Sequence, residues 1–385
     1  MLLCGATLMS LVLTMCVRWI GRLMQAHDGH GVAGQVKAPI RRVPNIGGIA
    51  IFLTIALPIV AIMALVHSPL WADIIQYNSD LPIHGQGLRD QTPVALWFLA
   101  GLLTMHVMGL LDDRHPLPAS IKLPVMLCVA GVVCWQTDSR LLTLLDPHVG
   151  GPWLSLILTV VWVGVVTNAM NFMDNMDGLS AGVAAIAGAC FMAATMTHAQ
   201  PQWFIAGCLA LVVGACVGFL FFNYPMPRAT VFMGDGGSLV LGFALAILTV
   251  RSTYVDPTLA GGWYGVLMPL MVLAVPLYDF ASVVVLRLSQ GKSPFVGDLQ
   301  HLSHRLVQRG LSRRASVVVI HGLTGITALG AIMLGTLKPW QALILGSQTM
   351  LVLLIVAIYE RKATARTLPV DGQRAGADSA SENRP

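Results

Sequence analysis

The amino-acid sequence predicts an all-α, polytopic integral membrane protein with about eleven transmembrane helices. Hydrophobic residues make up 56% of the 385 residues, and charged residues only 11%. An ordinary soluble domain carries roughly 25% charged residues, so this chain could not cover a water-exposed surface. A water-soluble enzyme, a nucleic-acid-binding protein and a disordered protein are therefore excluded, and the lipid bilayer is the expected surrounding.

The apolar residues gather into eleven runs, each expected to form one membrane-spanning helix of ~20 residues. The runs cover 1–20, 46–66, 93–111, 119–137, 153–170, 178–198, 203–222, 238–251, 264–286, 315–336 and 340–358. The first has no charged segment before it and no small-residue cleavage site, which favours a retained helix over a signal peptide. Residues 1–360 are expected to form one membrane domain, and the polar residues 361–385 a disordered cytoplasmic tail.

Lysine and arginine predict the orientation of these helices. One set of alternating segments holds 19 of the 23 basic residues, and the opposite set holds the other four. The basic set comprises 18–45, 112–122, 171–177, 223–237, 287–314 and 359–385. Because basic residues concentrate in cytoplasmic loops, the N-terminus is predicted outside and the C-terminus inside.

The predicted cytoplasmic side carries four polar clusters, and the first is the pair Asp112-Asp113 at the end of the third run. Adjacent carboxylates repel each other unless a cation or a shared proton intervenes. The pair is either a solvated helix end or, as ionisable residues at a membrane boundary often are, part of a functional site.

The second cluster is Asn168, Asn171 and Asp174, followed by Asp177. The spacing of three predicts that the first three share one helix face. Amide and carboxylate oxygens are hard ligands that suit Mg²⁺ or Mn²⁺. A polar contact between two helices is the alternative interpretation.

The third cluster is the glycine-rich segment Gly234-Asp235-Gly236-Gly237-Ser238. Glycines allow backbone N–H groups to converge on an anion, Ser238 can cap the following helix, and the N-terminus of that helix favours phosphate. Asp235 fits such a loop if a divalent ion bridges its carboxylate to a diphosphate.

The fourth cluster is His301, His304 and Arg305 in the longest basic loop. These cationic side chains suggest a site that binds phosphate oxygens. The alternative is a basic helix that lies on anionic lipid. Asp279, within the ninth run, either pairs with Arg287 or lines a cavity. Together the clusters are suited to phosphoryl transfer, with one substrate held in the lipid.

These residues resemble the polyprenyl-phosphate N-acetylhexosamine-1-phosphate transferases, glycosyltransferase family 4, over roughly residues 1–360. The matching motifs are Pro44-Asn-Ile-Gly-Gly48, Leu-Asp112-Asp113 with Lys122, Asn-x-x-Asn-x-x-Asp-x-x-Asp-Gly-Leu at 168–179, and Phe-Met-Gly-Asp-x-Gly-Ser at 232–238. The branch closest in pattern is the undecaprenyl-phosphate N-acetylglucosamine-1-phosphate type.

The resemblance implies roles for the candidate residues. Asp235 and Asn171 would hold Mg²⁺, or Mn²⁺, against the diphosphate. Asp112 and Asp113 would meet the acceptor phosphate, one of them as base. The remaining implied assignments are Lys122 for charge neutralisation, Asp174 as a further catalytic acid, Asp177 and Phe232 at the uridine, Asn168 and Gly234 at the substrate, and His301, His304 and Arg305 at the diphosphate and sugar.

The implied reaction transfers N-acetylglucosamine-1-phosphate, or a close 2-acetamido sugar phosphate, from a UDP-sugar to undecaprenyl phosphate. It would begin O-antigen, lipopolysaccharide or another cell-envelope glycan at the cytoplasmic face of a bacterial inner membrane. Ser303 stands where this branch usually has a histidine, which leaves the sugar open. The alternatives are phospho-N-acetylmuramoyl-pentapeptide transfer, an intramembrane prenyltransferase and an ion-coupled transporter. The oligomeric state is open, a homodimer being one option.

Overall fold

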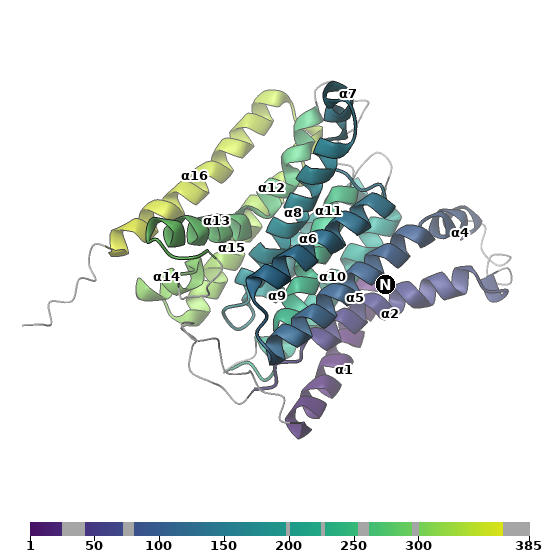
Figure 1. The fold of residues 1–385 in the computed structure, drawn as a ribbon, viewed down its shortest axis with the longest axis horizontal. Coiled ribbons are helices and arrows are strands. Elements are labelled where there is room, and N and C mark those ends of the chain that lie inside the picture. Colours follow the sequence, from purple (N-terminus) through teal and green to yellow (C-terminus); the bar gives the residue numbers. More distant parts are fainter. Residues whose placement is uncertain are drawn as a thin grey trace, which may run out of the picture.

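The computed structural model describes residues 1–24, 43–71, 81–197, 201–224, 228–252, 262–294 and 300–364 (Figure 1). Every regular element in these ranges is helical, which confirms the predicted fold class. The α-helices are α1 Leu2–Leu23, α2 Gly48–Val66, α4 Leu81–Asp90, α5 Thr92–Arg114, α6 Ala119–Gln136, α7 Asp146–Val149, α8 Trp153–Phe172, α9 Leu179–Thr197, α10 Trp203–Asn223, α11 Asp235–Arg251, α12 Met268–Val272, α13 Ala274–Ser289, α14 Leu302–Gln308, α15 Arg313–Ala331 and α16 Pro339–Thr364. Residues 365–385 of the predicted tail lie outside the described residues.

Nine helices in the described ranges are long and apolar enough to cross a membrane: α1, α2, α5, α6, α8, α9, α10, α15 and α16. A tenth candidate span is broken, because Gly265–Val272 and Ala274–Ser289 meet at an angle of 65°. The single helix expected over 264–286 is therefore interrupted at Leu273. Pro276 explains the break, since its ring has no N–H to donate to the carbonyl four residues earlier and clashes with it.

Helix α11 corresponds to the predicted run at 238–251 and lies at the centre of the bundle. All its residues from Gly236 to Val250 are buried, and it packs against α2, α5, α8, α9 and α10. Its 17 residues extend about 26 Å, which is shorter than the ~30 Å hydrocarbon core. Because neighbouring helices surround α11 on every side, it is protected from the lipid and need not match the bilayer thickness.

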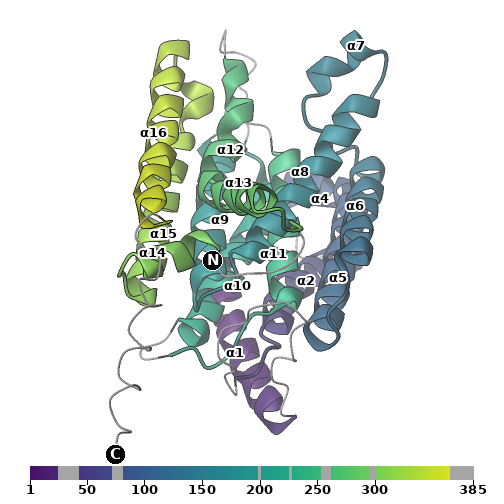
Figure 2. The ribbon, with the colours of Figure 1, turned by 60° about the vertical axis from the view of Figure 1, so that its left-hand side comes forward.

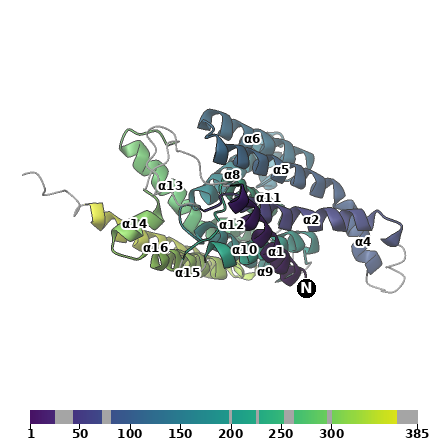
Figure 3. The ribbon, with the colours of Figure 1, turned by 90° about the horizontal axis from the view of Figure 1, so that it is seen from below.

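The other helices flank this central one. Helices α14, α15 and α16 lie on one side of α11, and α5 and α6 lie on the other (Figure 2). Figure 3 shows α5 and α6 along one edge and α15 and α16 along the opposite edge. The ends of α5 and α8 and the start of α11 carry five candidate residues, and both α5 and α8 pack against α11. These five are Asp112, Asp113, Asn168, Asn171 and Asp235.

Close backbone contact around α11 generates a prediction about stability. A Cβ atom at Gly109 of α5 would lie 2.4 Å from the carbonyl carbon of Asp235, whereas one at Gly322 of α15 would meet nothing within 4 Å. We expect Gly109→Ala to lower the free energy of unfolding by about 1–3 kcal/mol through overpacking. Gly322→Ala should be neutral or stabilising by up to ~1 kcal/mol, because alanine favours a helix over glycine.

The midpoint of thermal unfolding in detergent measures both variants. A clearly lower midpoint for Gly109→Ala than for Gly322→Ala is expected. Equal midpoints would contradict the close approach of α5 to the first turn of α11.

Candidate active site

The segment before α11 is fixed by backbone hydrogen bonds to the segment before α2. Phe232 N–H donates to the carbonyl of Pro44 at 2.8 Å, and Gly47 N–H donates to the carbonyl of Phe232 at 2.9 Å. Gly48 N–H donates to the carbonyl of Met233, also at 2.9 Å. These bonds fix the position from which Gly234, in the left-handed region at φ 69°, turns the chain into α11.

The first turn of α11 binds the carboxylate of Asp113. Asp235 N–H donates to Asp113 Oδ1 at 3.0 Å, and Gly236 N–H donates to Asp113 Oδ2 at 3.2 Å. The next two N–H groups, of Gly237 and Ser238, donate to the carbonyl of Gly234. The glycine-rich segment therefore binds an anion, as predicted, but that anion is a carboxylate of the protein instead of the expected diphosphate.

Ser238 and Asp113 both have partners that the sequence did not indicate. Ser238 does not cap α11 but accepts a hydrogen bond from Asn171 Nδ2 at 2.8 Å. Asp113 is also held by Asn45, whose amide donates to its Oδ1 at 3.1 Å. Asp113 thus has a defined structural role at the start of α11, and its contact with an acceptor phosphate stays a prediction.

Asp112, the other member of the acidic pair, shares a lysine with Asp235. Lys122 Nζ lies 2.7 Å from Asp112 Oδ2 and also forms an ion pair with Asp235 Oδ2. The side chains of Asp112 and Asp235 are 17% and 26% exposed, so the trio lies at the surface of the bundle and remains accessible. Two carboxylates against one ammonium leave one negative charge in excess, which favours an additional cation.

The end of α8 adds one of its predicted residues to this trio. Asn171 Nδ2 donates to Asp235 Oδ1 at 2.8 Å, so Asn171 and Asp235 are adjacent. Asn168 instead donates to the carbonyl of Gly164 in its own helix at 2.8 Å. Asp174 was predicted to share a helix face with Asn168 and Asn171. It does not, because α8 ends at Phe172 and Asp174 lies in the following turn.

Asp177 and Phe232 lie close to the connection between α10 and α11. Asp177 Oδ2 accepts a hydrogen bond from the backbone N–H of Ala229 at 3.4 Å, and both Asp177 and the ring of Phe232 are half-buried. The structure therefore places Asp177 beside the segment that leads to Phe232. Their predicted contacts with uridine stay predictions.

The predicted histidine and arginine cluster forms a second group, and its buried centre is Asp279. Asp279, with no exposed surface, accepts hydrogen bonds from His301 Nδ1 at 2.9 Å and from the backbone N–H of Leu302. Asp279 thus pairs with His301 and not with Arg287, which donates to the carbonyl of Pro294. The ring of His304 lies 6.5 Å from that of His301.

Arg305, which the motif suggested as a ligand for phosphate oxygens, binds other protein groups in this structure. Its guanidinium donates to Ser282 Oγ at 2.7 Å and to the carbonyl of Gln300, and it forms an ion pair with Glu360 at 3.0 Å. With 12% of its side chain exposed, Arg305 connects protein segments, and its predicted contact with the diphosphate stays a prediction.

Three residues that the motifs did not indicate take part in this region. His106 Nδ1 donates a hydrogen bond at 2.7 Å to the carbonyl of Gly236, and the His106 ring stacks on Phe52. Phe172 lies 5.2 Å from the ring of His301, and Glu360 pairs with Arg305. His106 could have been identified from sequence as an ionisable residue within an apolar run. Phe172 and Glu360 carry no such signal, because their role depends on helix packing.

The donor set around Asp235 fits a magnesium ion that is bound together with a substrate. Within the described residues, no group of three or more His, Cys, Asp or Glu side chains could hold a metal alone. Magnesium is commonly held by one or two carboxylates plus substrate phosphates. Asp235 and Asp112 supply such carboxylates and Asn171 an amide oxygen, and a carboxylate oxygen that accepts one hydrogen bond retains a second lone pair.

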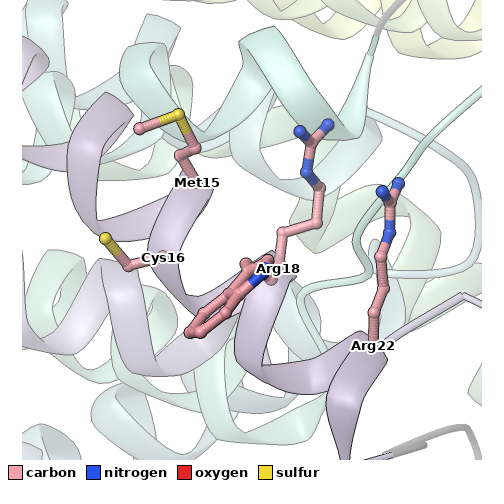
Figure 4. A pocket seen from close by; sticks show the side chains of 5 residues that line it. Met15, Cys16, Arg18 and Arg22 are labelled. Carbon is pink, nitrogen blue, oxygen red and sulfur yellow. The ribbon is translucent and has the colours of Figure 1, made fainter.

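A surface groove elsewhere on the bundle contains none of the candidate residues. It runs along α1 and is lined by Met15, Cys16, Arg18, Trp19 and Arg22 (Figure 4). Arg18 also stacks over the ring of Phe222 at 4.8 Å and donates to Thr230 Oγ1 at 3.3 Å. The groove is therefore separate from the Asp112–Lys122–Asp235 trio.

Comparison with known proteins places this arrangement in a family. Residues 95–253 match the family model described as glycosyl transferase family 4. The chain is 29% identical over 303 residues to a probable undecaprenyl-phosphate N-acetylglucosaminyl 1-phosphate transferase of Bacillus subtilis (strain 168), covering 78% of this chain and 75% of the relative.

Two more relatives have related names. The chain is 30% identical over 342 residues to decaprenyl-phosphate N-acetylglucosaminephosphotransferase of Mycolicibacterium smegmatis, covering 83% of this chain and 78% of the relative. It is 28% identical over 241 residues to undecaprenyl-phosphate alpha-N-acetylglucosaminyl 1-phosphate transferase of Escherichia coli (strain K12), covering 59% and 62%. With its apolar helices and this similarity, the chain belongs to glycosyl transferase family 4 and is a membrane-embedded glycosyl-1-phosphate transferase.

Proposed function

We propose that the protein transfers N-acetylglucosamine-1-phosphate, or a close 2-acetamido sugar phosphate, from a UDP-sugar to undecaprenyl phosphate. The products would be UMP and a polyprenyl-diphosphate-linked sugar, the first lipid-linked intermediate of a cell-envelope glycan such as O-antigen. The Asp112–Lys122–Asp235 trio with Asn171 carries the proposal, because it gathers oxygen ligands and a cation at one accessible point. The names of the relatives support both the sugar and the polyprenyl acceptor.

Magnesium, bound by Asp235 with Asn171 and Asp112, would supply positive charge to the diphosphate of the donor. The side chains of this site do the rest by positioning and charge neutralisation, which carry most of the catalysis in phosphoryl transfer. Lys122 holds Asp112 and Asp235 together and offsets charge on the entering phosphate. Asp112 is the better placed of the acidic pair to meet the acceptor, because Asp113 is bound to the first turn of α11.

The remaining candidates would hold the rest of the donor. Asp177 and Phe232 are proposed at the uridine, with the ring of Phe232 stacking on the base. His301 and His304 are proposed at the sugar, with Asp279 orienting His301. One phosphoanhydride replaces another, so no energy-rich co-substrate is required.

The proposed setting is the inner membrane of a bacterium, with the site facing the cytoplasm. The candidate residues lie at the ends of α5 and α8 and at the starts of α6 and α11. Those helix ends belong to the side that carries 19 of the 23 lysine and arginine residues. The positive-inside rule then places the site and the C-terminus inside and the N-terminus outside.

A panel of donors tests the proposed reaction. Purified protein is mixed with undecaprenyl phosphate, Mg²⁺ and radiolabelled UDP-sugars, among them UDP-N-acetylglucosamine, UDP-N-acetylgalactosamine and UDP-N-acetylmuramoyl-pentapeptide. We expect label to enter the lipid from a UDP-2-acetamido sugar, and chelation of divalent ions to abolish this transfer. Preference for the muramoyl-pentapeptide donor, or full turnover in excess chelator, would overturn the assignment of sugar or of metal.

Asp235→Asn tests the metal ligand. The substitution keeps the size of the side chain but removes its charge, so the ion and its stabilisation of the transition state are lost. Each ~1.4 kcal/mol of lost stabilisation is tenfold in rate, and we expect at least about a hundredfold lower turnover. The matched control is Asp138→Asn, whose side chain is 81% exposed beyond the far end of α6 and which should keep the wild-type rate. Equal rates in the two variants would show that Asp235 is not a metal ligand.

Single cysteines in a chain whose seven native cysteines have been replaced test the orientation. His148→Cys in α7 and Arg313→Cys at the start of α15 both replace exposed residues. In intact cells a membrane-impermeant maleimide should label the first, and it should label the second only after the membrane is opened. Labelling of both in intact cells would contradict the predicted topology.

A further inference from the structure

The outermost helix of the bundle carries a buried acid near its end. Between residues 339 and 360 of α16, buried positions belong to Ala342, Thr349 and Glu360. Apolar side chains such as Leu343 and Met350 point outward, as expected for a helix in contact with lipid. A carboxylate that is only 9% exposed on such a helix requires compensating partners.

Glu360 has two partners, one from each neighbouring element. Arg305 Nε of α14 lies 3.0 Å from Glu360 Oε2, and the hydroxyl of Tyr278 in α13 donates to the same oxygen at 3.1 Å. One turn further along α14, Arg309 donates to the carbonyls of Tyr359 and Glu360 and lies 4.9 Å from the centre of the Tyr359 ring. Two arginines spaced by four residues, on one face of α14, thus bind the same turn of α16.

The other side of α14 faces the candidate site. Asp279 binds His301 and the N–H of Leu302 at the start of the helix, and Ser303 Oγ donates to Asn175 Oδ1. Asn175 belongs to the turn after α8, three residues beyond Phe172. The seven-residue helix α14 is therefore held between this turn and α16, as the placement of α14 below α13 and beside α16 in Figure 2 illustrates.

We propose that Glu360, with Tyr278 supporting it, is a positioning residue that holds Arg305 and thereby fixes α14 and His301 at the donor side of the site. Arg305 is 12% exposed and lies 3.9 Å from Asp279 as well. Without Glu360, Asp279 would be the acid that, among the described residues, remains near the charge of Arg305, and Asp279 is the residue that orients His301. Arg305 would then compete with His301 for the carboxylate of Asp279. The orientation of His301 would change, although Glu360 itself touches no substrate.

This inference rests on the proposed function for its kinetic consequence. If α14 occupies its competent position only part of the time, the apparent affinity for the donor falls by that fraction. The bound donor stabilises α14 in the position that binds it, so the chemical step proceeds at the wild-type rate. The signature of a positioning role is therefore a higher KM for the UDP-sugar with little change in kcat.

The test compares Glu360→Gln, Glu360→Asp and Tyr278→Phe with wild type, and Gln348→Ala, an exposed residue of α16, is the control. We expect Glu360→Gln to raise KM for the UDP-sugar by about fivefold or more and to change kcat by less than about twofold. Glu360→Asp should restore much of the loss because it keeps the charge, Tyr278→Phe should shift KM less, and Gln348→Ala should match wild type. A fall in kcat without a rise in KM would mean that Glu360 serves only folding, and would overturn the proposal.

Hydrogen–deuterium exchange provides a readout that needs no turnover. In Glu360→Gln the amides of residues 302–309 should exchange faster than in wild type, while those of α11 should not change. Unchanged exchange in 302–309 would overturn the positioning role whatever the kinetics show. If wild-type protein transfers sugar phosphate from no UDP-sugar, the proposed function fails, and the exchange comparison still decides the role of Glu360.

Discussion

The buried first turn of α11 is the constraint on which the rest of the site depends. A helix that begins inside the protein has four N–H groups without partners in its own helix, and each buried unsatisfied group costs about 1–3 kcal/mol. Here the carboxylate of Asp113 accepts hydrogen bonds from two of them, those of Asp235 and Gly236, and the N–H of Gly237 donates to the carbonyl of Gly234. For Asp113 to reach this position, the end of α5 must lie against α11, which is why a Cβ atom at Gly109 would overlap the backbone of Asp235.

This arrangement gives the two adjacent aspartates different tasks. Consecutive residues on a helix point about 100° apart, so when Asp113 is directed at α11, Asp112 is directed at the neighbouring α6. There it meets Lys122, which also binds Asp235 from the start of α11. The residue that secures α11 and the residue available for chemistry are thus placed by the same helix end. Under the proposed function, an acidic pair that looks redundant in the sequence has two roles, a structural one for Asp113 and a catalytic one for Asp112.

Much of this could be predicted from the sequence, and the parts that could not have physical reasons. The length of the apolar runs is enough to locate the helices, because spanning a membrane demands ~20 apolar residues. The apolar runs do not reveal that Asp112, Lys122, Asn171 and Asp235 lie close together. The resemblance to a known family implied this proximity, and the structure shows it. The motif around Gly234 indicated an anion-binding turn but not which anion, because that depends on how closely α5 approaches. The partner of Arg305 is Glu360, more than fifty residues later, and no local pattern signals such a pairing.

The end of α8 connects the two groups of candidate residues. Asn171 and Phe172 are neighbours in sequence and point to different partners, the first to Asp235 and the second to His301 and Arg287. Because both belong to the last turn of one helix, a rigid element and not a loop sets the separation between the Asp112–Lys122–Asp235 trio and the histidine group. A donor that places its diphosphate at Asp235 and its sugar at His301 would have to lie across this helix end. In that binding mode, Asp174 to Asp177, which directly follow the end of α8, would lie along the donor.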